Sequence, residues 1–426
     1  MKIYRANIIY TPTPDKLAII PHGYIVVKSN GQVEGIYTEL PENMDWRRQV
    51  MDFGDKILIP AFNDLHVHAP QYRNMGLALD LELLPWLNTY TFPEETKYAD
   101  PEYARRLYRR FVHELWMQGT MRSAVFATIH PEATRILADL FIQAGMGAYV
   151  GLVGMNRNSP ETLQNTTAEL MEGMQMLKAH LDEHGNDGLV QPIITPRFVP
   201  SCSDKMLTAL GEYAAKTGLP VQSHLSENRS EIDWVKELEP DSTCYGDAYN
   251  RYGLFGQTPT LMAHCCYTDG EEMELMRKQG VYVVHCPMSN SNLSSGMAPI
   301  RKFLNAGINV ALGTDVSAGH HMSMLRVMQY AIQVSKLNYA QSHGEMPFLS
   351  LSEVVYLATK GGGSFFGKVG SFEPGYEFDA LLIDDSYLNY VHYTLEQRLE
   401  RYIYLGYDRD IKRRFCRGVE LTEPVM

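Results

Sequence analysis

Two patterns of apolar and polar positions divide the chain. Residues 1–58 alternate apolar and polar side chains in short runs such as IYRANIIYT and GYIVVKS, with Gly, Pro and Asn between them. This pattern is typical of short antiparallel strands joined by turns. Residues 369–426 return to it in FDALLIDD and RYIYLGY. We therefore expect the two ends of the chain to pair into one small β-sandwich domain.

Residues 59–368 follow a different pattern, in which short apolar runs alternate with longer stretches of helical spacing. PEYARRLYRRFVHELWMQG and DGEEMELMRKQG are two such stretches, and each closes on Gly, as helices often do. The expected strands are Leu58–Val67, Ser123–Thr128, Ala148–Val153, Val190–Pro196, Val221–His224, Thr260–His264, Val281–Cys286 and Asn309–Gly313. These eight strand–helix repeats predict an α/β fold, a closed (β/α)8 TIM-like barrel over residues 59–368.

Composition narrows the possible partners. The chain has 426 residues and a formal net charge of −12. An acidic surface repels phosphate groups, so neither nucleic acid nor an anionic membrane is expected as a partner. The basic cluster in IKRRFCRG, from Lys412 to Arg417, is expected to be a solvated strand face. The six cysteines form no CxxC motif and the N-terminus shows no apolar signal region, so we expect a cytoplasmic protein with free thiols.

Residues with metal-binding side chains follow the predicted barrel strands. His66 and His68, in LHVHAP, are two positions apart near the end of the first strand, so both side chains lie on one face of it. Later strands lead in the same way into His224 in PVQSHLSEN, His264 in TLMAHC and Asp315 in ALGTD. The C-terminal ends of barrel strands form the active-site mouth. A single HxH or GTD is weak evidence, but the whole set predicts one site.

This set of side chains indicates zinc chemistry. Imidazole nitrogens and a carboxylate are ligands that zinc accepts, with one position left open for water. Zinc lowers the pKa of a bound water from about 15.7 to about 7, which makes hydroxide available at neutral pH. A proton shuttle is also needed, and Glu227, three residues after His224, is the candidate. The alternative is that Glu227 only stabilises the start of a helix.

The ordered set HVH, SH, AH and GTD resembles the metal-dependent hydrolases of the amidohydrolase superfamily. Within that superfamily, the runs FNDLHVHAPQY, TPRF, QSHLSENRSE and HCPMSNSNLSSG resemble the guanine deaminases. The resemblance implies one zinc ion per chain, held by His66, His68, His224 and Asp315. It further implies that Glu227 is the proton shuttle, that Asp315 takes a proton from the attacking water, and that His264 contacts that water or a substrate nitrogen.

The resemblance also implies hydrolysis of guanine to xanthine and ammonia, in a purine site lined by Gln71, Trp86, Arg197 and Phe198. Arg197 has only hydrogen-bond donors, which suit the carbonyl oxygen of guanine and not the amine of adenine. Trp86 and Phe198 offer flat faces on which a purine stacks. Arg197 could instead form a structural salt bridge, and Trp86 could belong to the core.

Other interpretations stay open from the sequence. The chain could be another deaminase or a chlorohydrolase of the same superfamily, acting on an adenosine derivative, cytosine or a triazine, or it could be a non-catalytic barrel. The resemblance suggests a homodimer. The sequence assigns no role to His320 and His321. It leaves His285 and Asn290, in HCPMSN, open between shaping the pocket and forming a structural turn.

Overall fold

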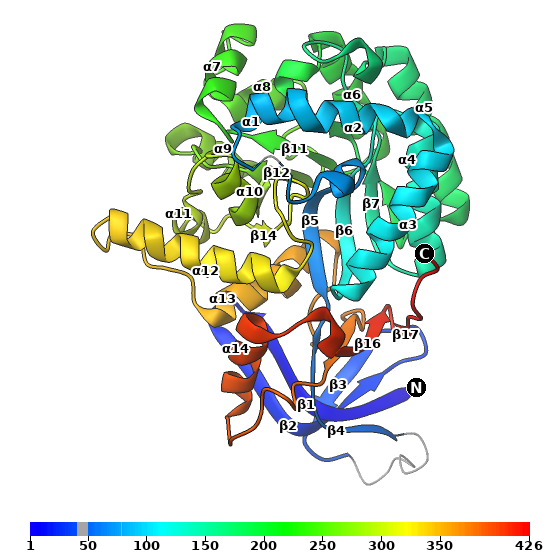
Figure 1. Ribbon diagram of the computed structural model, residues 1–426, viewed down its shortest axis with the longest axis vertical. Helices are drawn as coiled ribbons and strands as arrows, with labels where there is room; N and C mark the ends of the chain where they lie inside the picture. Colours follow the sequence, from blue (N-terminus) through cyan, green and yellow to red (C-terminus); the bar gives the residue numbers. More distant parts are fainter. Residues whose placement is uncertain (41–49, 78) are drawn as a thin grey trace.

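The structure, a computed structural model, describes residues 1–40, 50–77 and 79–426. A barrel surrounded by helices forms the larger part, and a sheet built from both chain ends lies at one end of it (Figure 1). The barrel strands are β5 (Phe62–His68), β6 (Thr120–Phe126), β7 (Gly147–Gly151), β9 (Val190–Pro192), β11 (Val221–Leu225), β12 (Thr260–His264), β13 (Tyr282–His285) and β14 (Val310–Leu312). Each of them overlaps a predicted strand, so the predicted strand order is confirmed.

The barrel closes through backbone hydrogen bonds. Its strands run parallel in two four-stranded sheets, β5-β6-β7-β9 and β11-β12-β13-β14. A bridge between Ile194 and Val221 joins the sheets on one side. On the other side, the N–H of Asp315 donates to the carbonyl oxygen of His66 over 2.8 Å. The short strands β8 (Val153–Gly154) and β10 (Thr195–Pro196) pair at the rim. The predicted α/β barrel is confirmed.

Helices cover the outside of the barrel, and local signals set their ends. α5 begins with a capping box, in which Thr166 and Glu169 bond each other's backbone N–H. α4 ends at Gly145, whose left-handed φ of 67° suits glycine. The helices are α1 (Leu83–Trp86), α2 (Phe92–Glu95), α3 (Pro101–Met117), α4 (Pro131–Ala144), α5 (Thr167–His184), α6 (Asp204–Thr217), α7 (Arg229–Leu238), α8 (Tyr245–Arg251), α9 (Gly270–Gln279), α10 (Pro287–Asn292), α11 (Ile300–Asn305), α12 (Met324–Gln341), α13 (Leu351–Tyr356) and α14 (Leu395–Leu405).

Alternation along the strands separates an inner core from an outer one. Leu261, Ala263 and Val284 belong to the apolar interior of the barrel. Met262 and Val283 pack outward, in the core shared with the helices. This period of two is the geometry of a strand, and it decides which residue at each strand end faces the mouth of the barrel.

The two chain ends form one continuous seven-stranded sheet, in the order β17-β16-β15-β4-β1-β2-β3. A small β-domain built from both termini is therefore confirmed. Neighbouring strands are antiparallel except β1 and β4, which run parallel. Tyr4, Phe378 and Phe415 form part of its own core. The strands are β1 (Lys2–Thr13), β2 (Lys16–Val27), β3 (Val33–Tyr37), β4 (Val50–Pro60), β15 (Ala380–Ile383), β16 (Ile411–Cys416) and β17 (Val419–Glu420). The domain boundaries at residues 58/59 and 368/369 stay a prediction.

The basic cluster of β16 is only partly solvated. Lys412 is exposed as expected. Arg414 is 6% exposed, and its guanidinium lies 4.0 Å from the centre of the Trp116 ring and donates to the Trp116 carbonyl oxygen. The prediction of a solvated face is wrong for Arg414, because the pairing of β16 shifts register between Ile411 and Arg413, so that Lys412 and Arg414 do not share a face although they are two positions apart. Within residues 1–40, 50–77 and 79–426, no helix has both the length and the apolar character needed to cross a membrane.

Candidate metal centre and active site

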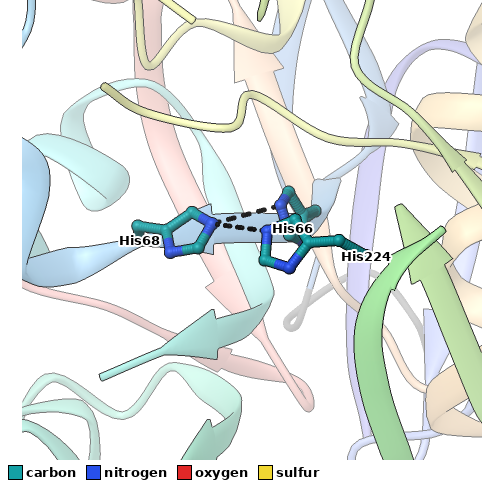
Figure 2. Close-up of side chains that lie close together, drawn as sticks. All are labelled: His66, His68 and His224. Carbon is teal, nitrogen blue, oxygen red and sulfur yellow. Dashed lines mark hydrogen bonds between the residues drawn. The ribbon is translucent and has the colours of Figure 1, made fainter. Parts of the chain in front are cut away.

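Three imidazole side chains meet at the mouth of the barrel. Nε2 of His68 lies 3.2 Å from Nε2 of His66 and 3.2 Å from Nε2 of His224 (Figure 2). His66 and His68 come from the end of β5, and His224 comes from the end of β11. Asp315 adds a carboxylate, whose Oδ1 is 3.2 Å from Nε2 of His66 and 3.4 Å from Nε2 of His68. The structure thus brings together the four residues that the sequence predicts as metal ligands.

The donor atoms of this cluster fit a metal ion. A tetrahedral zinc ion with bonds of about 2.0–2.1 Å separates its ligand atoms by about 3.3–3.4 Å. Four of the six spacings between donor atoms of the four residues are 3.2–3.4 Å, close to this value, whereas the ring nitrogens of His224 and the carboxylate oxygens of Asp315 are more than 4.0 Å apart. Nδ1 of His224 donates to the carbonyl oxygen of Arg197 over 2.6 Å. That bond places the proton on Nδ1 and leaves the lone pair of Nε2 for a metal. The cluster is therefore a metal-binding site in its geometry and its hydrogen bonding.

Burial and charge give the cluster the protonation states that a metal requires. Burial lowers the pKa of His66, His68 and His224, so these imidazoles are neutral. Burial alone raises the pKa of Asp315, but the neighbouring His66, His264 and His68 outweigh it and hold that pKa well below its usual range. Neutral imidazole and ionised carboxylate are the forms that bind metals.

His264 reaches the site through a local change in the backbone. Ala263 faces the barrel interior, so strict alternation would turn His264 toward the outer helices. His264 instead has a left-handed φ of 72°, and its Nε2 lies 3.8 Å from Oδ2 of Asp315. Its Nδ1 is 2.8 Å from Oδ1 of Asn290, which accepts the Nδ1 proton. Asn290 therefore turns the buried Nε2 of His264 toward the metal cluster.

Glu227 lies beside His264 and inside the pocket. Its Oε2 is 3.5 Å from Nε2 of His264, and its Oε1 accepts a hydrogen bond from the hydroxyl of Ser295 over 2.9 Å. Burial raises its pKa. The alternative role, stabilising the start of α7, belongs to Glu231, which accepts the backbone N–H of the N-cap residue Asn228 over 3.3 Å. Glu227 is thus free to face the metal cluster.

A pocket with about 440 Å³ of empty space opens beside the cluster. The predicted substrate residues all line it: Gln71, Trp86, Arg197 and Phe198. Sequence reasoning missed five further lining residues, namely Leu83, Leu87, Glu231, Leu293 and Ala318. The apolar ones carry no chemical signal in a sequence. The run QSHLSENRSE did contain Glu231, but nothing in it separates a capping carboxylate from one at a pocket wall.

Comparison with known proteins places this site in a family. Residues 57–421 match the sequence model of the amidohydrolase family. The chain belongs to that family. It is 36% identical to the guanine deaminase of Dictyostelium discoideum, over 98% of this chain and 97% of that protein. A solved guanine deaminase from C. acetobutylicum, with guanine bound in its active site, is 49% identical, with a TM-score of 0.96 over 99% of this chain and 100% of that one. E. coli guanine deaminase is 30% identical, with a TM-score of 0.89 over 100% of both chains.

Arg197 of this amidohydrolase both forms a salt bridge and lines the pocket. Its Nη1 donates to Oε2 of Glu95 over 2.7 Å, and both side chains are 5% exposed or less. Its guanidinium also lies 5.2 Å from the ring centre of Phe92. The salt bridge is therefore present, and the contact of Arg197 with a purine stays a prediction. The salt-bridge partner could not be predicted from the sequence, because Glu95 lies 102 positions away from Arg197.

Three other histidines do not join the cluster of the amidohydrolase site. Val284 faces the barrel interior, so regular alternation turns His285 outward, where it lines a separate small cavity against the helices. His320 bonds the side chain of Asn292 over 2.9 Å. His321 accepts a backbone N–H two residues later over 3.0 Å. These local hydrogen bonds account for the positions of His320 and His321.

Proposed function

We propose that this amidohydrolase hydrolyses guanine to xanthine and ammonia. One observation carries the proposal: donor side chains line a pocket that opens directly on the His/Asp cluster. The likeness to solved guanine deaminases, one of which holds guanine in its active site, supports the choice of substrate.

We propose zinc as the metal, with one ion per chain. Its ligands would be His66, His68, His224 and Asp315. Three neutral imidazoles and one carboxylate are a ligand set that zinc accepts. When bound, zinc acts as a Lewis acid and lowers the pKa of a coordinated water to about 7.

Two side chains transfer protons in the proposed reaction, and a third orients the attacking water. Asp315 accepts a proton from the attacking water as the water oxygen bonds to C2 of guanine. Glu227 delivers its own proton to the adjacent ring nitrogen, then takes up the proton left on the new C2 hydroxyl and passes it to the amine, so that the C2–N bond breaks, the C2 carbonyl forms and ammonia leaves. His264, held by Asn290 on its far side, orients the attacking water with Nε2. Glu227 is suited to this work because burial raises the pKa of its carboxyl group.

The pocket walls suit a purine with a carbonyl group. Arg197 and Gln71 face the pocket with N–H donors, which pair with acceptor atoms of guanine. Trp86 and Phe198 supply apolar ring surface beside them. Adenine presents an amine where guanine has its carbonyl oxygen, and an amine cannot accept from these donors.

We also propose that the protein is a cytoplasmic homodimer. The dimer is what the resemblance of the sequence motifs suggests, and light scattering on the purified protein tests it. The six cysteines are free in the structure, which suits a reducing compartment.

A direct assay tests the proposed function. Purified protein is mixed with guanine, and ammonia and xanthine are followed with time. Adenine, an adenosine derivative, cytosine and a triazine serve as competing substrates. Equal amounts of xanthine and ammonia from guanine are expected. Faster turnover of one of the other substrates, or no xanthine from a zinc-loaded sample, would contradict the proposal.

A further inference from the structure

A buried carboxylate behind the pocket contacts both of its polar recognition residues. Glu95, at the end of α2, is 3% exposed. Its Oε2 accepts from Nη1 of Arg197 over 2.7 Å, and its Oε1 accepts from Nε2 of Gln71 over 2.9 Å. Each carboxylate oxygen thus holds one of the two side chains that present donors to the substrate.

We propose that Glu95 is a positioning residue that fixes the donor character of the pocket. It would thereby select a purine with a carbonyl oxygen over one with an amine at the same position. This inference rests on the proposed deamination of guanine and adds a residue that acts on specificity without touching the substrate.

The orientation of the Gln71 amide depends on Glu95. The backbone N–H of Ser317 donates to Oε1 of Gln71 over 3.2 Å, while Nε2 of Gln71 donates to Glu95. A flipped amide would place its oxygen against the carboxylate and its nitrogen against the N–H of Ser317. Both contacts would then be repulsive. The remaining N–H of Gln71 is therefore the group available to the pocket, and it can only donate.

The guanidinium of Arg197 is also held from two sides. Glu95 neutralises its charge, and the Phe92 ring lies 5.2 Å from it. An unpaired guanidinium would be costly at 4% exposure. With Glu95 in place, the other N–H groups of Arg197 keep a fixed direction at the pocket wall, and they too can only donate.

The neighbouring residue Glu94 provides a matched control. It has the same side chain, lies in the same helix and is also 3% exposed. Its carboxylate bonds a different set of residues: Lys97 over 2.6 Å, Arg73 over 3.2 Å, and the hydroxyl of Tyr103. Glu94 is not bonded to Arg197 or Gln71. Glu94→Gln therefore shows what the loss of a buried charge in α2 does when the contacts with Arg197 and Gln71 are kept.

The test compares Glu95→Gln and Glu94→Gln on three purines that all carry the amine to be hydrolysed. Guanine has a carbonyl oxygen on the six-membered ring, 2-aminopurine has hydrogen there, and 2,6-diaminopurine has a second amine.

Glu95→Gln should lower kcat/KM for guanine about tenfold or more, because the substrate loses about one hydrogen bond to a charged group. The loss should fall mainly on KM. For 2-aminopurine, kcat/KM should change less, and the preference for guanine over 2,6-diaminopurine should shrink. Glu94→Gln should leave kcat/KM unchanged for each of the three purines.

A second variant, Glu95→Asp, keeps the proposal testable if Glu95→Gln does not fold. Glu95→Asp keeps the charge beside Arg197 but is one methylene too short to hold both partners, so its specificity should lie between wild type and Glu95→Gln. Zinc content and melting temperature are measured for every variant. Equal losses on all three purines in both Glu95 variants, or unchanged specificity in both, would overturn the proposal. Wild-type protein that does not deaminate guanine in the same assay would instead refute the proposed function.

Discussion

Replacement of Arg197 by Met should damage stability and specificity by separate routes. Met has about the same length and no donor. The change removes one partner of an ion pair whose side chains are 5% and 4% exposed and whose N–O distance is 2.7 Å. Removing one partner of a buried pair typically costs about 3–5 kcal/mol, because the other charge stays buried and unpaired. Glu95 keeps its hydrogen bond from Gln71, so we expect a loss near the lower limit.

The decrease in kcat/KM for guanine comes from a different contact, the one between Arg197 and the substrate. A guanine carbonyl that faces Met instead of a guanidinium loses a charged hydrogen bond, worth about 1.5–3 kcal/mol. At 1.4 kcal/mol for each factor of ten, kcat/KM for guanine should fall about 10–150-fold. Zinc content should stay the same, because the guanidinium of Arg197 is not among the cluster atoms.

The double variant Arg197→Met/Glu95→Gln separates the two routes. It removes the unpaired charge, so most of the lost stability should return, while guanine turnover stays low. Denaturant unfolding measures the first quantity and steady-state kinetics measures the second. If Arg197→Met keeps guanine kcat/KM within about threefold of wild type, less than the loss of even a weak charged hydrogen bond, Arg197 is a structural residue only. If the single variant is as stable as wild type, the assigned role of the ion pair is wrong.

Three further predictions concern the metal, the shuttle and the barrel wall. A strong chelator should abolish activity and zinc should restore it; full activity in metal-free protein would contradict the metal site. Glu227→Gln keeps the hydrogen bond from Ser295 but loses the titrating proton, so turnover should fall about 10²–10⁴-fold at unchanged zinc content; near-normal turnover would remove Glu227 from the mechanism. Asp379→Ala removes the bond that Nε of Arg122 makes over 2.7 Å. Arg122 keeps Glu377 as a second partner, so the free energy of unfolding should fall by about 3 kcal/mol, the lower limit for breaking a buried pair. Unchanged denaturant stability would contradict the last prediction.

The metal ligands could be predicted from the sequence because their signal is local. His66 and His68 share a face through the period of two, and strands of a parallel barrel end at the same rim. His224 and Asp315 then join them without any knowledge of loops. The order of the strands is enough to bring four ligands together that are separated by up to 249 positions, from His66 to Asp315.

His264 and His285 show where that reasoning stops. Both end neighbouring strands, β12 and β13, and alternation would send both outward, since Ala263 and Val284 face inward. His285 follows the rule. His264 departs from it through its φ of 72°, which depends on the turn after the strand and on the bond to Asn290. Neither strand pattern nor residue type reveals which of the two enters the site.

The link between Arg197 and the metal cluster suggests why recognition and catalysis are hard to separate in this site. The backbone of Arg197 accepts the Nδ1 proton of His224, which sets the tautomer of a metal ligand. Its side chain, held by Glu95, faces the substrate. A shift of this one residue therefore changes both the direction of a donor and the orientation of an imidazole. Substitutions that move the Arg197 backbone should alter zinc affinity together with specificity, whereas side-chain substitutions such as Arg197→Met should alter specificity and stability but leave zinc affinity unchanged.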